Sequence, residues 1–179
     1  MPKLLANLEL SLNGVTEAPE TWPPMDHGDV LEVVQAQMAE TAAILFGRAT
    51  FQHFEAYWPR VREDPSGFAA HLRRTPKFVV SRTLKATEWE NTTFLSGDPA
   101  DEAARLKDTA GGNVVILGSG RLVSTLAAAG VIDEFQFWLH PLALARGAHL
   151  FEGGPDLRLR LLASRAFRAG IVQLTYAPG

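Results

Sequence analysis

Three short segments place glycine, hydroxyl and arginine residues directly after apolar runs that have the length of buried strands. These residues are Gly118, Ser119 and Gly120, then Gly47, Arg48 and Thr50, and finally Ser81, Arg82 and Thr83. Glycine lets a phosphate approach the backbone, and a following helix offers free N–H groups and a partial positive charge. Arginine adds a planar fork that binds phosphate oxygens in pairs. The combination indicates a site for a ligand with several separate phosphates, such as a dinucleotide.

These segments act together only if their strands lie parallel in one sheet. The carboxyl ends of parallel strands then lie along one edge, where open α/β sheets bind their ligands. Ser81 and Arg82 offer a hydroxyl and a guanidinium to one terminal phosphate, the chemistry expected for the 2′-phosphate of NADP. Each piece also has a simpler interpretation. A glycine after a strand is commonly only a turn, and Arg48 or Arg82 alone is typical of a solvated surface cation.

The spacing of apolar residues predicts the elements that must hold these segments. Strands are predicted over residues 4–12, 42–46, 77–80, 89–95, 114–117, 133–144, 157–167 and 171–176. Helices are predicted over residues 30–39, 50–57, 68–74, 99–109 and 121–129. Asp29 is the expected N-cap of the first helix. Residues 16–27 contain Pro19, Pro23 and Pro24, and we expect them to form a long exposed loop that acts as a lid.

Strand–helix repeats come first along the chain, and a strand-rich segment follows. This order predicts an α/β fold of three layers, with helices on both faces of a mostly parallel central sheet and a C-terminal antiparallel hairpin at one edge. The chain shows no internal repeat, low-complexity tract or linker, so residues 1–179 are predicted to form a single domain.

The composition excludes several other classes of function. The formal net charge is −3, whereas domains that bind nucleic acid by bulk electrostatics are usually basic. The absence of cysteine rules out disulfides and thiolate metal sites, and it makes the cytoplasm the expected location. No segment has the length of a membrane span. The five histidines show no metal-ligand spacing, so no metal site is predicted.

Six motifs, taken in order, resemble the dihydrofolate reductase-like superfamily. They are Ser11-Leu-Asn-Gly14, Leu45-Phe-Gly-Arg-Ala-Thr-Phe51, Val79-Val-Ser-Arg-Thr-Leu84, Ile116-Leu-Gly-Ser-Gly-Arg-Leu122, Asp133-Glu-Phe135 and Leu150-Phe-Glu-Gly153. Within the superfamily they are most similar to the branch that contains the reductase domain of bacterial riboflavin biosynthesis. The resemblance covers nearly the whole chain.

The resemblance implies the dihydrofolate reductase fold, NADPH as hydride donor, and a homodimer. The implied cofactor contacts fall into groups that share a loop. The contacts near the pyrophosphate and the 2′-phosphate are Gly47, Arg48 and Thr50, and those at the 2′-phosphate are Ser81 and Arg82. The contacts around the pyrophosphate and the nicotinamide are Gly118, Ser119, Gly120, Arg121 and Leu122. Beside the nicotinamide lie Ala6 and the turn that includes Asn13, Gly14 and Val15.

The chain departs from the family pattern where an acid is expected. The first family motif commonly reads Ser-Leu-Asp-Gly, but here Asn13 replaces the acid, and an amide cannot donate a proton as a carboxylic acid does. Dihydrofolate reductases carry an acid on the first helix. Glu32 is the nearest candidate, although a solvent-facing side chain would explain it as well. Asn13 and Glu32 are thus the catalytic candidates, and the proton donor stays open.

Two functions remain open. The first is an NADPH-dependent reductase that transfers hydride to a small pyrimidine- or pterin-like heterocycle, as in the 5-amino-6-(5-phosphoribosylamino)uracil reductase of riboflavin biosynthesis. The second is a non-catalytic nucleotide- or ligand-binding protein on the same fold, which the loss of the acid at Asn13 favours.

Trp22 and Trp58 either line the open side of the ligand cleft at the strand ends or pack in the interior. Residues 135–144 form either a core strand or a dimer interface.

Overall fold

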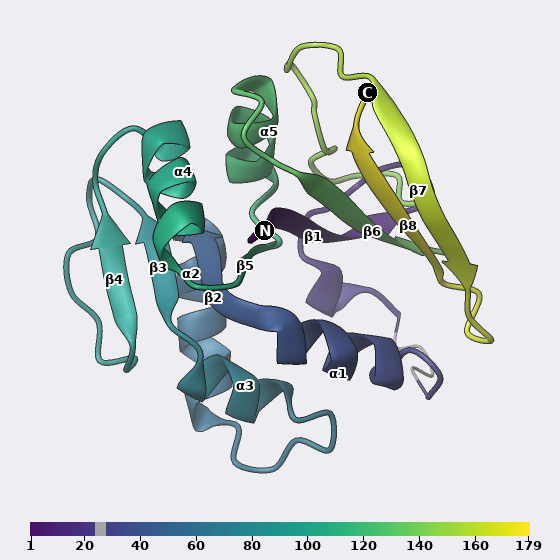
Figure 1. Cartoon of the computed structure of the whole chain (residues 1–179). Coiled ribbons are helices and arrows are strands. Elements are labelled where there is room, and N and C mark those ends of the chain that lie inside the picture. The colour runs from purple at the N-terminus through teal and green to yellow at the C-terminus, as the bar shows by residue number, and fades with distance from the viewer. Residues whose placement is uncertain (24–27) are drawn as a thin grey trace.

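The structure, a computed structural model, describes residues 1–23 and 28–179 of the chain. Figure 1 shows one sheet with helices on both of its faces. The strands are β1 (Leu4–Ser11), β2 (Thr41–Gly47), β3 (Lys77–Val80), β4 (Thr92–Leu95), β5 (Asn113–Leu117), β6 (Glu134–His140), β7 (Leu159–Ala166) and β8 (Val172–Pro178). Each predicted strand is therefore present, with ends that shift by a few residues.

Five α-helices and two short 3-10 helices connect the strands of the described chain. They are η1 (Pro19–Thr21), α1 (Leu31–Glu40), α2 (Arg48–Tyr57), η2 (Trp58–Arg60), α3 (Phe68–Arg74), α4 (Pro99–Thr109) and α5 (Gly120–Ala128). The predicted helices are all present. Both α2 and α5 begin earlier than expected, so Arg48 and Gly120 lie inside a first helical turn.

The sheet has the strand order β4-β3-β2-β5-β1-β6-β8-β7. The first six strands in this order pair in parallel, and β6–β8 and β8–β7 pair antiparallel. This confirms the three-layer α/β fold with a C-terminal antiparallel hairpin. Because β1 to β6 run the same way, the turns after β1, β2, β3 and β5 all lie at one edge.

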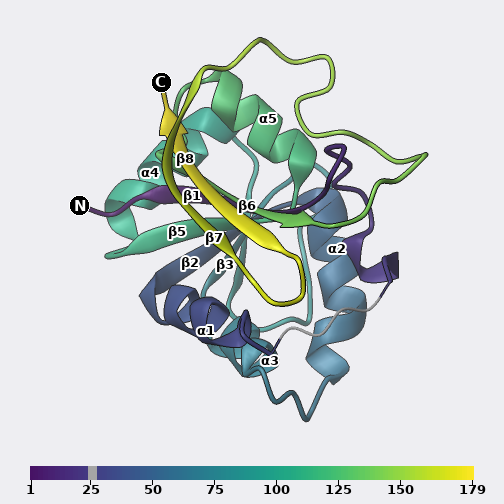
Figure 2. The same ribbon diagram turned by 90° about the vertical axis from the view of Figure 1, so that its right-hand side faces the viewer.

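Helices cover the sheet on two sides (Figure 2). On one side α4 and α5 pack Leu106 and Leu126 against the largest cluster of buried side chains, which includes Leu8 and Ile116. On the other side α2 and α3 form a second, mainly aromatic cluster, and α1 packs against Trp138 of β6 in a third. Burying such side chains stabilises the fold by about 1.5–3 kcal/mol each.

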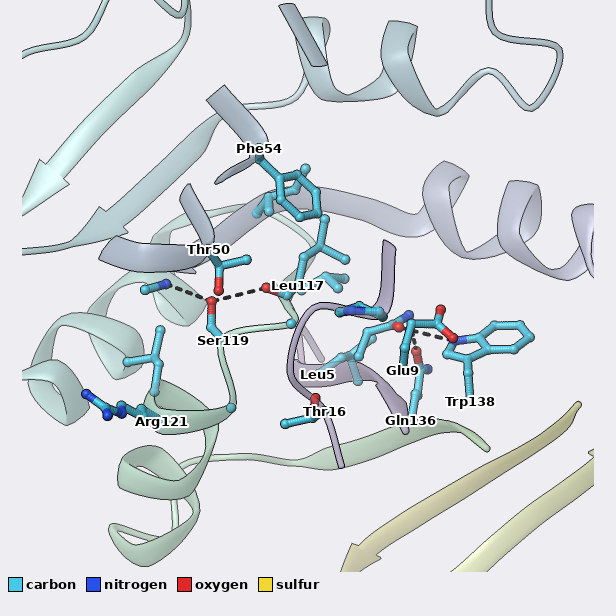
Figure 3. Close-up of a pocket in the computed structure, with 18 of the residues that line it drawn as sticks. Leu5, Glu9, Thr16, Thr50, Phe54, Leu117, Ser119, Arg121, Gln136 and Trp138 are labelled. Carbon is cyan, nitrogen blue, oxygen red and sulfur yellow. Dashed lines mark hydrogen bonds between the residues drawn. The ribbon is translucent and has the colours of Figure 1, made fainter. Parts of the chain in front are cut away.

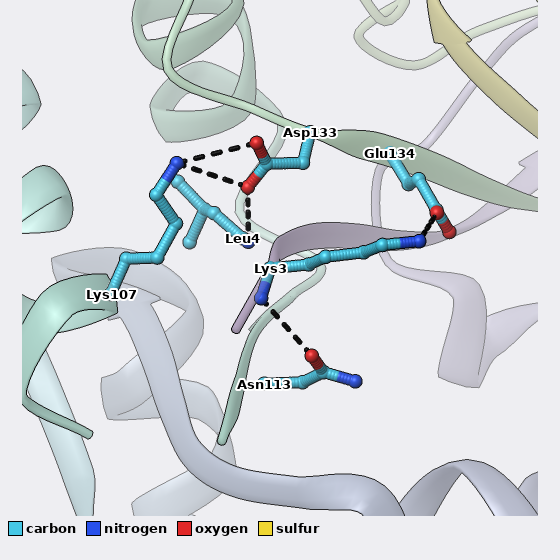
Figure 4. Close-up of polar contacts among 6 residues, drawn as sticks. All are labelled: Lys3, Leu4, Lys107, Asn113, Asp133 and Glu134. Carbon is cyan, nitrogen blue, oxygen red and sulfur yellow. Dashed lines mark hydrogen bonds and ion pairs between the residues drawn. The ribbon is translucent and has the colours of Figure 1, made fainter. Parts of the chain in front are cut away.

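Polar contacts fix the start of β1 to its two neighbouring strands (Figure 4). The Leu4 N–H donates to Asp133 Oδ2 at 2.7 Å, and Lys107 Nζ donates to the same oxygen at 3.1 Å. On the other side, the Lys3 N–H donates to Asn113 Oδ1 at 3.1 Å. These contacts set the register of β1. Since side chains alternate along a strand, the register decides which of them face α1.

Two local predictions were wrong. Asp29 does not cap α1: Val30 occupies the N-cap position, and the Asp29 carboxylate instead accepts the Arg168 N–H at 2.9 Å. The strand predicted over residues 133–144 ends at His140, because Pro141 follows and cannot donate to the sheet. That strand is also no sheet edge, since β6 pairs with β1 and with β8. A dimer contact through an edge of β6 is therefore excluded.

Candidate functional site

A single large cleft opens at the carboxyl ends of β1, β2 and β5, on the side of the sheet covered by α1 and α2. Its volume is about 1390 Å³, larger than the roughly 300–1,000 Å³ of a typical ligand pocket. The cleft therefore has room for an extended ligand together with a second, smaller one. Its position agrees with the general rule for ligand sites in open α/β sheets.

Most of the residues predicted from the glycine and arginine motifs meet in this cleft. Those that line it are Gly47, Arg48, Thr50, Gly118, Ser119, Gly120, Arg121 and Leu122. Figure 3 shows Thr50 and Ser119 side by side, with Arg121 at the start of α5. The two turns are far apart in the sequence, and the pairing of β2 with β5 brings them together. Whether they hold a cofactor stays a prediction.

The helices that begin at this cleft both lack the usual N-terminal stabilisation. Neither α2 nor α5 has a side-chain cap or an acidic residue in its first turn. Each instead carries an exposed arginine there, Arg48 in α2 and Arg121 in α5. Cations are unfavourable near the positive end of a helix dipole. The arrangement thus leaves two sets of N–H groups and two guanidinium groups available to an anion.

Helix α4 of the same protein shows the ordinary pattern. The Asp98 side chain caps it by accepting the N–H groups of Ala100 and Asp101, and the first turn holds the acids Asp101 and Glu102. This helix does not line the cleft. Helices α1 and α3 also lack an N-cap side chain. The feature that sets α2 and α5 apart is therefore the arginine in the first turn of each helix, at the cleft.

The Ser119 hydroxyl joins the two turns. It accepts the Gly47 N–H at 2.9 Å and donates to the Leu117 carbonyl at 3.1 Å (Figure 3). The Ser119 backbone is left-handed, with a φ of 59°. Because its proton is already donated, this hydroxyl fixes the shape of the cleft and has no second proton to offer a ligand.

Gly120 permits a close approach that a larger residue would block. A Cβ atom at this position would lie 3.0 Å from Thr16 Cγ2 of the loop after β1. That contact is at the tight limit, so the Thr16 side chain would have to shift by a few tenths of an ångström. The glycine therefore lets the loop after β1 close directly over the N-terminus of α5.

Ser81 and Arg82 do not line the main cleft. They lie with Val80 and Thr83 around a second hollow of about 380 Å³, and Arg48 lines both spaces. The Ser81 hydroxyl accepts the N–H groups of Thr83 and Leu84 at 3.2 and 2.9 Å, so it shapes the turn after β3. Arg82 is exposed. Arg48 thus connects the hollow to the cleft, as a ligand with two separated phosphates would require.

Val15 of the predicted site is buried and lines neither space, and four further predicted site residues do not line them either. Ala6 is fully buried in the core beneath α4 and α5, on the opposite face of the sheet from the cleft. Gly14 occupies a left-handed turn with a φ of 86°. Glu32 is an exposed side chain on α1, in agreement with its solvent-facing interpretation. The fourth residue, Asn13, has a clear structural role.

Asn13 ties the turn after β1 to the loop that follows β6. Its Nδ2 donates to the Leu144 carbonyl at 2.8 Å, and its Oδ1 accepts the Leu144 N–H at 3.0 Å. The Ser11 hydroxyl donates to the same Oδ1 at 2.9 Å. An amide can make this two-way contact with a backbone, whereas a carboxylate has no N–H to donate. The replacement of the family's acid thus has a local reason.

Sequence reasoning missed a polar group on the floor of the cleft. Asn7 of β1 donates through Nδ2 to Gln37 Oε1 of α1 and to Gln136 Oε1 of β6, both at 3.4 Å, and accepts Trp138 Nε1–H at 3.1 Å. Glu9, two residues further along β1, also lines the cleft (Figure 3). The available signal was the alternation in β1. Polar residues at every second position of a central strand are unusual unless that face meets a ligand.

The loop after β1 forms one wall of the cleft. Residues 16–20 line it, which agrees with the predicted lid, although residues 19–21 are helical and not irregular. The remainder of that prediction, residues 24–27, lies outside the described residues. Trp22 packs edge-on against His140, with ring centroids 5.2 Å apart, and Trp58 packs against Phe54 and Phe68. Neither tryptophan lines the cleft.

Burial lowers the pKa of two groups, of which His71 lines the cleft and Lys77 does not. Desolvation, with smaller contributions from Arg74 and Lys77, lowers the pKa of His71 to about 4, so this histidine is neutral at pH 7. Desolvation also lowers the pKa of Lys77 to about 8. The fully buried Lys77 ammonium donates to the carbonyls of Leu72 and Thr75 at the end of α3. His71 therefore cannot act as a charged group in the cleft.

The described part of the chain carries neither a cluster of metal ligands nor a membrane-spanning helix. Among residues 1–23 and 28–179, no three His, Asp or Glu side chains lie close enough together to hold a metal ion. Of the helices that the structure describes, none has the length and apolar character that crossing a membrane requires.

The fold is of the dihydrofolate reductase-like class, and the edge of its sheet carries a cleft lined by two arginines and two helix N-termini. A dihydrofolate reductase from Enterococcus faecalis complexed with NADP(H) superposes with a TM-score of 0.65 and 16% identity, covering 99% of this chain and 96% of that chain. The chain belongs to the RibD C-terminal domain family, whose sequence profile matches residues 2–173.

Two other proteins are similar to this chain in fold or in sequence. RibD of Acinetobacter baumannii superposes with a TM-score of 0.71 and 17% identity over 100% of this chain and 58% of that chain. In sequence, the uncharacterized protein YyaP of Bacillus subtilis (strain 168) is 27% identical over 187 aligned positions, which cover 97% of this chain and 94% of YyaP.

Proposed function

We propose that the protein is an NADPH-dependent reductase that transfers hydride to a pyrimidine- or pterin-like heterocycle. The observation that carries this proposal is the pair of uncapped helix N-termini, each with an arginine in its first turn, at one cleft. The family assignment and the NADP(H) complex of a protein with a similar fold also support it.

The residues present fit the charge and shape of NADPH. The first turns of α2 and α5, with Arg48 and Arg121, would hold the pyrophosphate by free N–H groups and guanidinium groups. Arg82 and Arg48 would hold the 2′-phosphate at the second hollow. When bound, the cofactor supplies a hydride with its electron pair.

The other end of the cleft suits a flat heterocycle. The amides of Asn7, Gln37 and Gln136 come from three elements and present both donors and acceptors, which match the edge of a pyrimidine ring. The wall formed by residues 16–20 would exclude water, and the rigid strands would hold the ring in one orientation. Orientation and water exclusion would supply most of the rate gain.

A non-catalytic ligand-binding protein on the same fold is the second candidate. Two observations favour it: Asn13 stands where the family has an acid, and Glu32 is exposed and does not line the cleft. Both functions require NADPH binding. They differ in whether the bound cofactor is consumed.

The first experiment measures cofactor binding. We expect NADPH to raise the melting temperature and to bind more tightly than NADH. Arg82→Ala should weaken NADPH about tenfold, since the lost charged hydrogen bond is exposed and contributes about 1.4 kcal/mol. The same change should alter NADH binding less than about twofold. Arg62→Ala, which removes an exposed arginine that lines neither space, is the matched control.

The second experiment follows NADPH oxidation at about 340 nm with dihydrofolate or a ribosylaminouracil as acceptor. Acceleration by either compound supports the reductase, and binding without oxidation supports the second candidate. If neither NADPH nor NADH shifts the melting temperature at saturation, both candidates fail. Equal losses for NADPH and NADH in Arg82→Ala would remove the 2′-phosphate assignment.

We also propose a cytoplasmic homodimer, and β7 is the surface that supports it. This strand is a sheet edge, and its Leu161 and Leu162 are 51% and 43% exposed. Unpaired apolar edge strands tend to pair with another chain. Light scattering of the wild type and of Leu161→Lys tests this: the variant should be monomeric, and a monomeric wild type would contradict the proposal.

A further inference from the structure

Glu9 and His140 form a polar pair that sequence analysis did not connect. They lie on the adjacent parallel strands β1 and β6, 131 residues apart in the chain, and Glu9 Oε2 contacts His140 Nε2. The Glu9 side chain is 42% exposed and lines the cleft, whereas the His140 side chain is 10% exposed. The carboxyl group is thus the member that a ligand can reach, and the imidazole is the shielded partner.

Aromatic rings surround this pair. Trp22 meets the His140 ring edge-on at 5.2 Å and an interplanar angle of 78°. Trp138, which is 3% exposed, is the register partner of Glu9 on β6. The ring of Trp22 shields the imidazole side of the pair from water, which strengthens a hydrogen bond there. The hydrogen bond between the two groups uses one proton, carried by either the carboxyl group or the imidazole.

Other titratable side chains also line the cleft, among them His53, His71 and His149. The polar side chains nearest Glu9 along the strands, Asn7 and Gln136, are amides without a transferable proton. The other carboxylates that line the cleft belong to different elements. They are Glu17 before η1, Glu20 within η1, Glu40 at the end of α1 and Glu152 in the loop after β6. Glu17 already accepts the Ala148 N–H at 2.9 Å, and Glu20 lies 3.3 Å from His53 Nε2.

We propose that the Glu9–His140 pair is the proton donor for the reduction, an inference that rests on the proposed function. In the balanced step, the substrate carbon gains a hydride with its electron pair from a dihydronicotinamide, which is oxidised to the nicotinamide cation. The π electrons of the substrate's C=N or C=O bond move to nitrogen or oxygen. That atom takes the proton from the Glu9 carboxyl group, and the pair regains a proton from water.

The first test needs no substrate. A downfield imidazole N–H resonance of His140 is expected in the proton NMR spectrum of the wild type. Glu9→Gln keeps the size of the side chain but removes the carboxylate, so this resonance should disappear. A His140 resonance that is absent in the wild type, or unchanged in Glu9→Gln, would overturn the claim that the pair holds a proton.

The second test measures turnover with whichever acceptor the wild type reduces. We expect Glu9→Gln to lower kcat about 100-fold or more, with the Kd for NADPH unchanged. Glu63→Gln, the same chemical change on an exposed loop away from the cleft, is the matched control. For Glu9→Ala, added formate should restore part of the activity, because it replaces the missing carboxyl group. A purely structural role would not respond to formate.

The outcomes separate this proposal from the proposed function. A wild type that reduces none of the acceptors refutes the reductase itself. A wild type that is active while Glu9→Gln keeps turnover within about threefold refutes only the proton donor. Loss of turnover in Glu32→Gln, with Glu9→Gln active, would move the donor to α1 and also overturn the proposal.

Discussion

The Ser119 hydroxyl is the contact whose removal tests the geometry of the cleft most directly. It is the side chain that connects the turn after β2 with the turn after β5, through Gly47 and Leu117. Ser119→Ala removes both hydrogen bonds and keeps the left-handed backbone, whose φ is 59°. Ser119→Gly removes the same bonds and also relieves the strain of a side chain in that conformation.

The expected magnitudes follow from these two contributions. Each hydrogen bond contributes about 1 kcal/mol net, so Ser119→Ala should lower the free energy of unfolding by about 2 kcal/mol. Relief of the left-handed strain should return about 1 kcal/mol in Ser119→Gly, after the entropy of glycine is counted. The order of stability should therefore be wild type, then Ser119→Gly, then Ser119→Ala.

Urea unfolding at equilibrium measures these differences, provided that the m-value is unchanged. Ser124→Ala is the matched control, because its hydroxyl donates only within α5, to the Gly120 carbonyl at 3.0 Å. It should change stability by less than about 0.5 kcal/mol. NADPH should also bind more weakly to Ser119→Ala, since the two turns lose their alignment. A Ser119→Ala protein as stable as wild type, or less destabilised than Ser119→Gly, would refute this reasoning.

The remaining predictions concern the turn after β1 and the buried histidine. Asn13→Asp loses the hydrogen bond to the Leu144 carbonyl and should destabilise the exposed turn by about 1 kcal/mol without raising kcat; a gain in turnover would show that an acid there donates a proton. The folded-state pKa of His71, about 4, lies below its unfolded value of 6.5. As the pH falls from 6.5 to about 4, the unfolded chain therefore binds a proton that the folded chain does not bind, and the folded state loses stability. The free energy of unfolding should decrease by about 2 kcal/mol from pH 7 to pH 5, and this decrease should vanish in His71→Gln; a decrease of equal size in that variant would assign it to other groups.

Much of the fold was predictable because its signals are local. The alternation of Ala6, Leu8, Leu10 and Leu12 identified β1, and the spacing of apolar residues identified α4 and α5. Errors occurred at element ends, where neighbouring groups compete. The carboxylate of Asp29 binds the N–H of Arg168, a contact between residues 139 positions apart that no local pattern contains.

The sequence alone determined the residue types of the proposed anion site. Its glycines, at 118 and 120, and its arginines, at 48, 82 and 121, follow strands that can be recognised from composition and spacing. Tertiary structure alone decided how these residues are divided between a main cleft and a second hollow, with Arg48 shared by both. It also decided that Asn13 binds the backbone and that Glu9 meets His140. The physical reason is that a side chain's face and its neighbours depend on strand register, and register is set by pairing between segments that are distant in the chain.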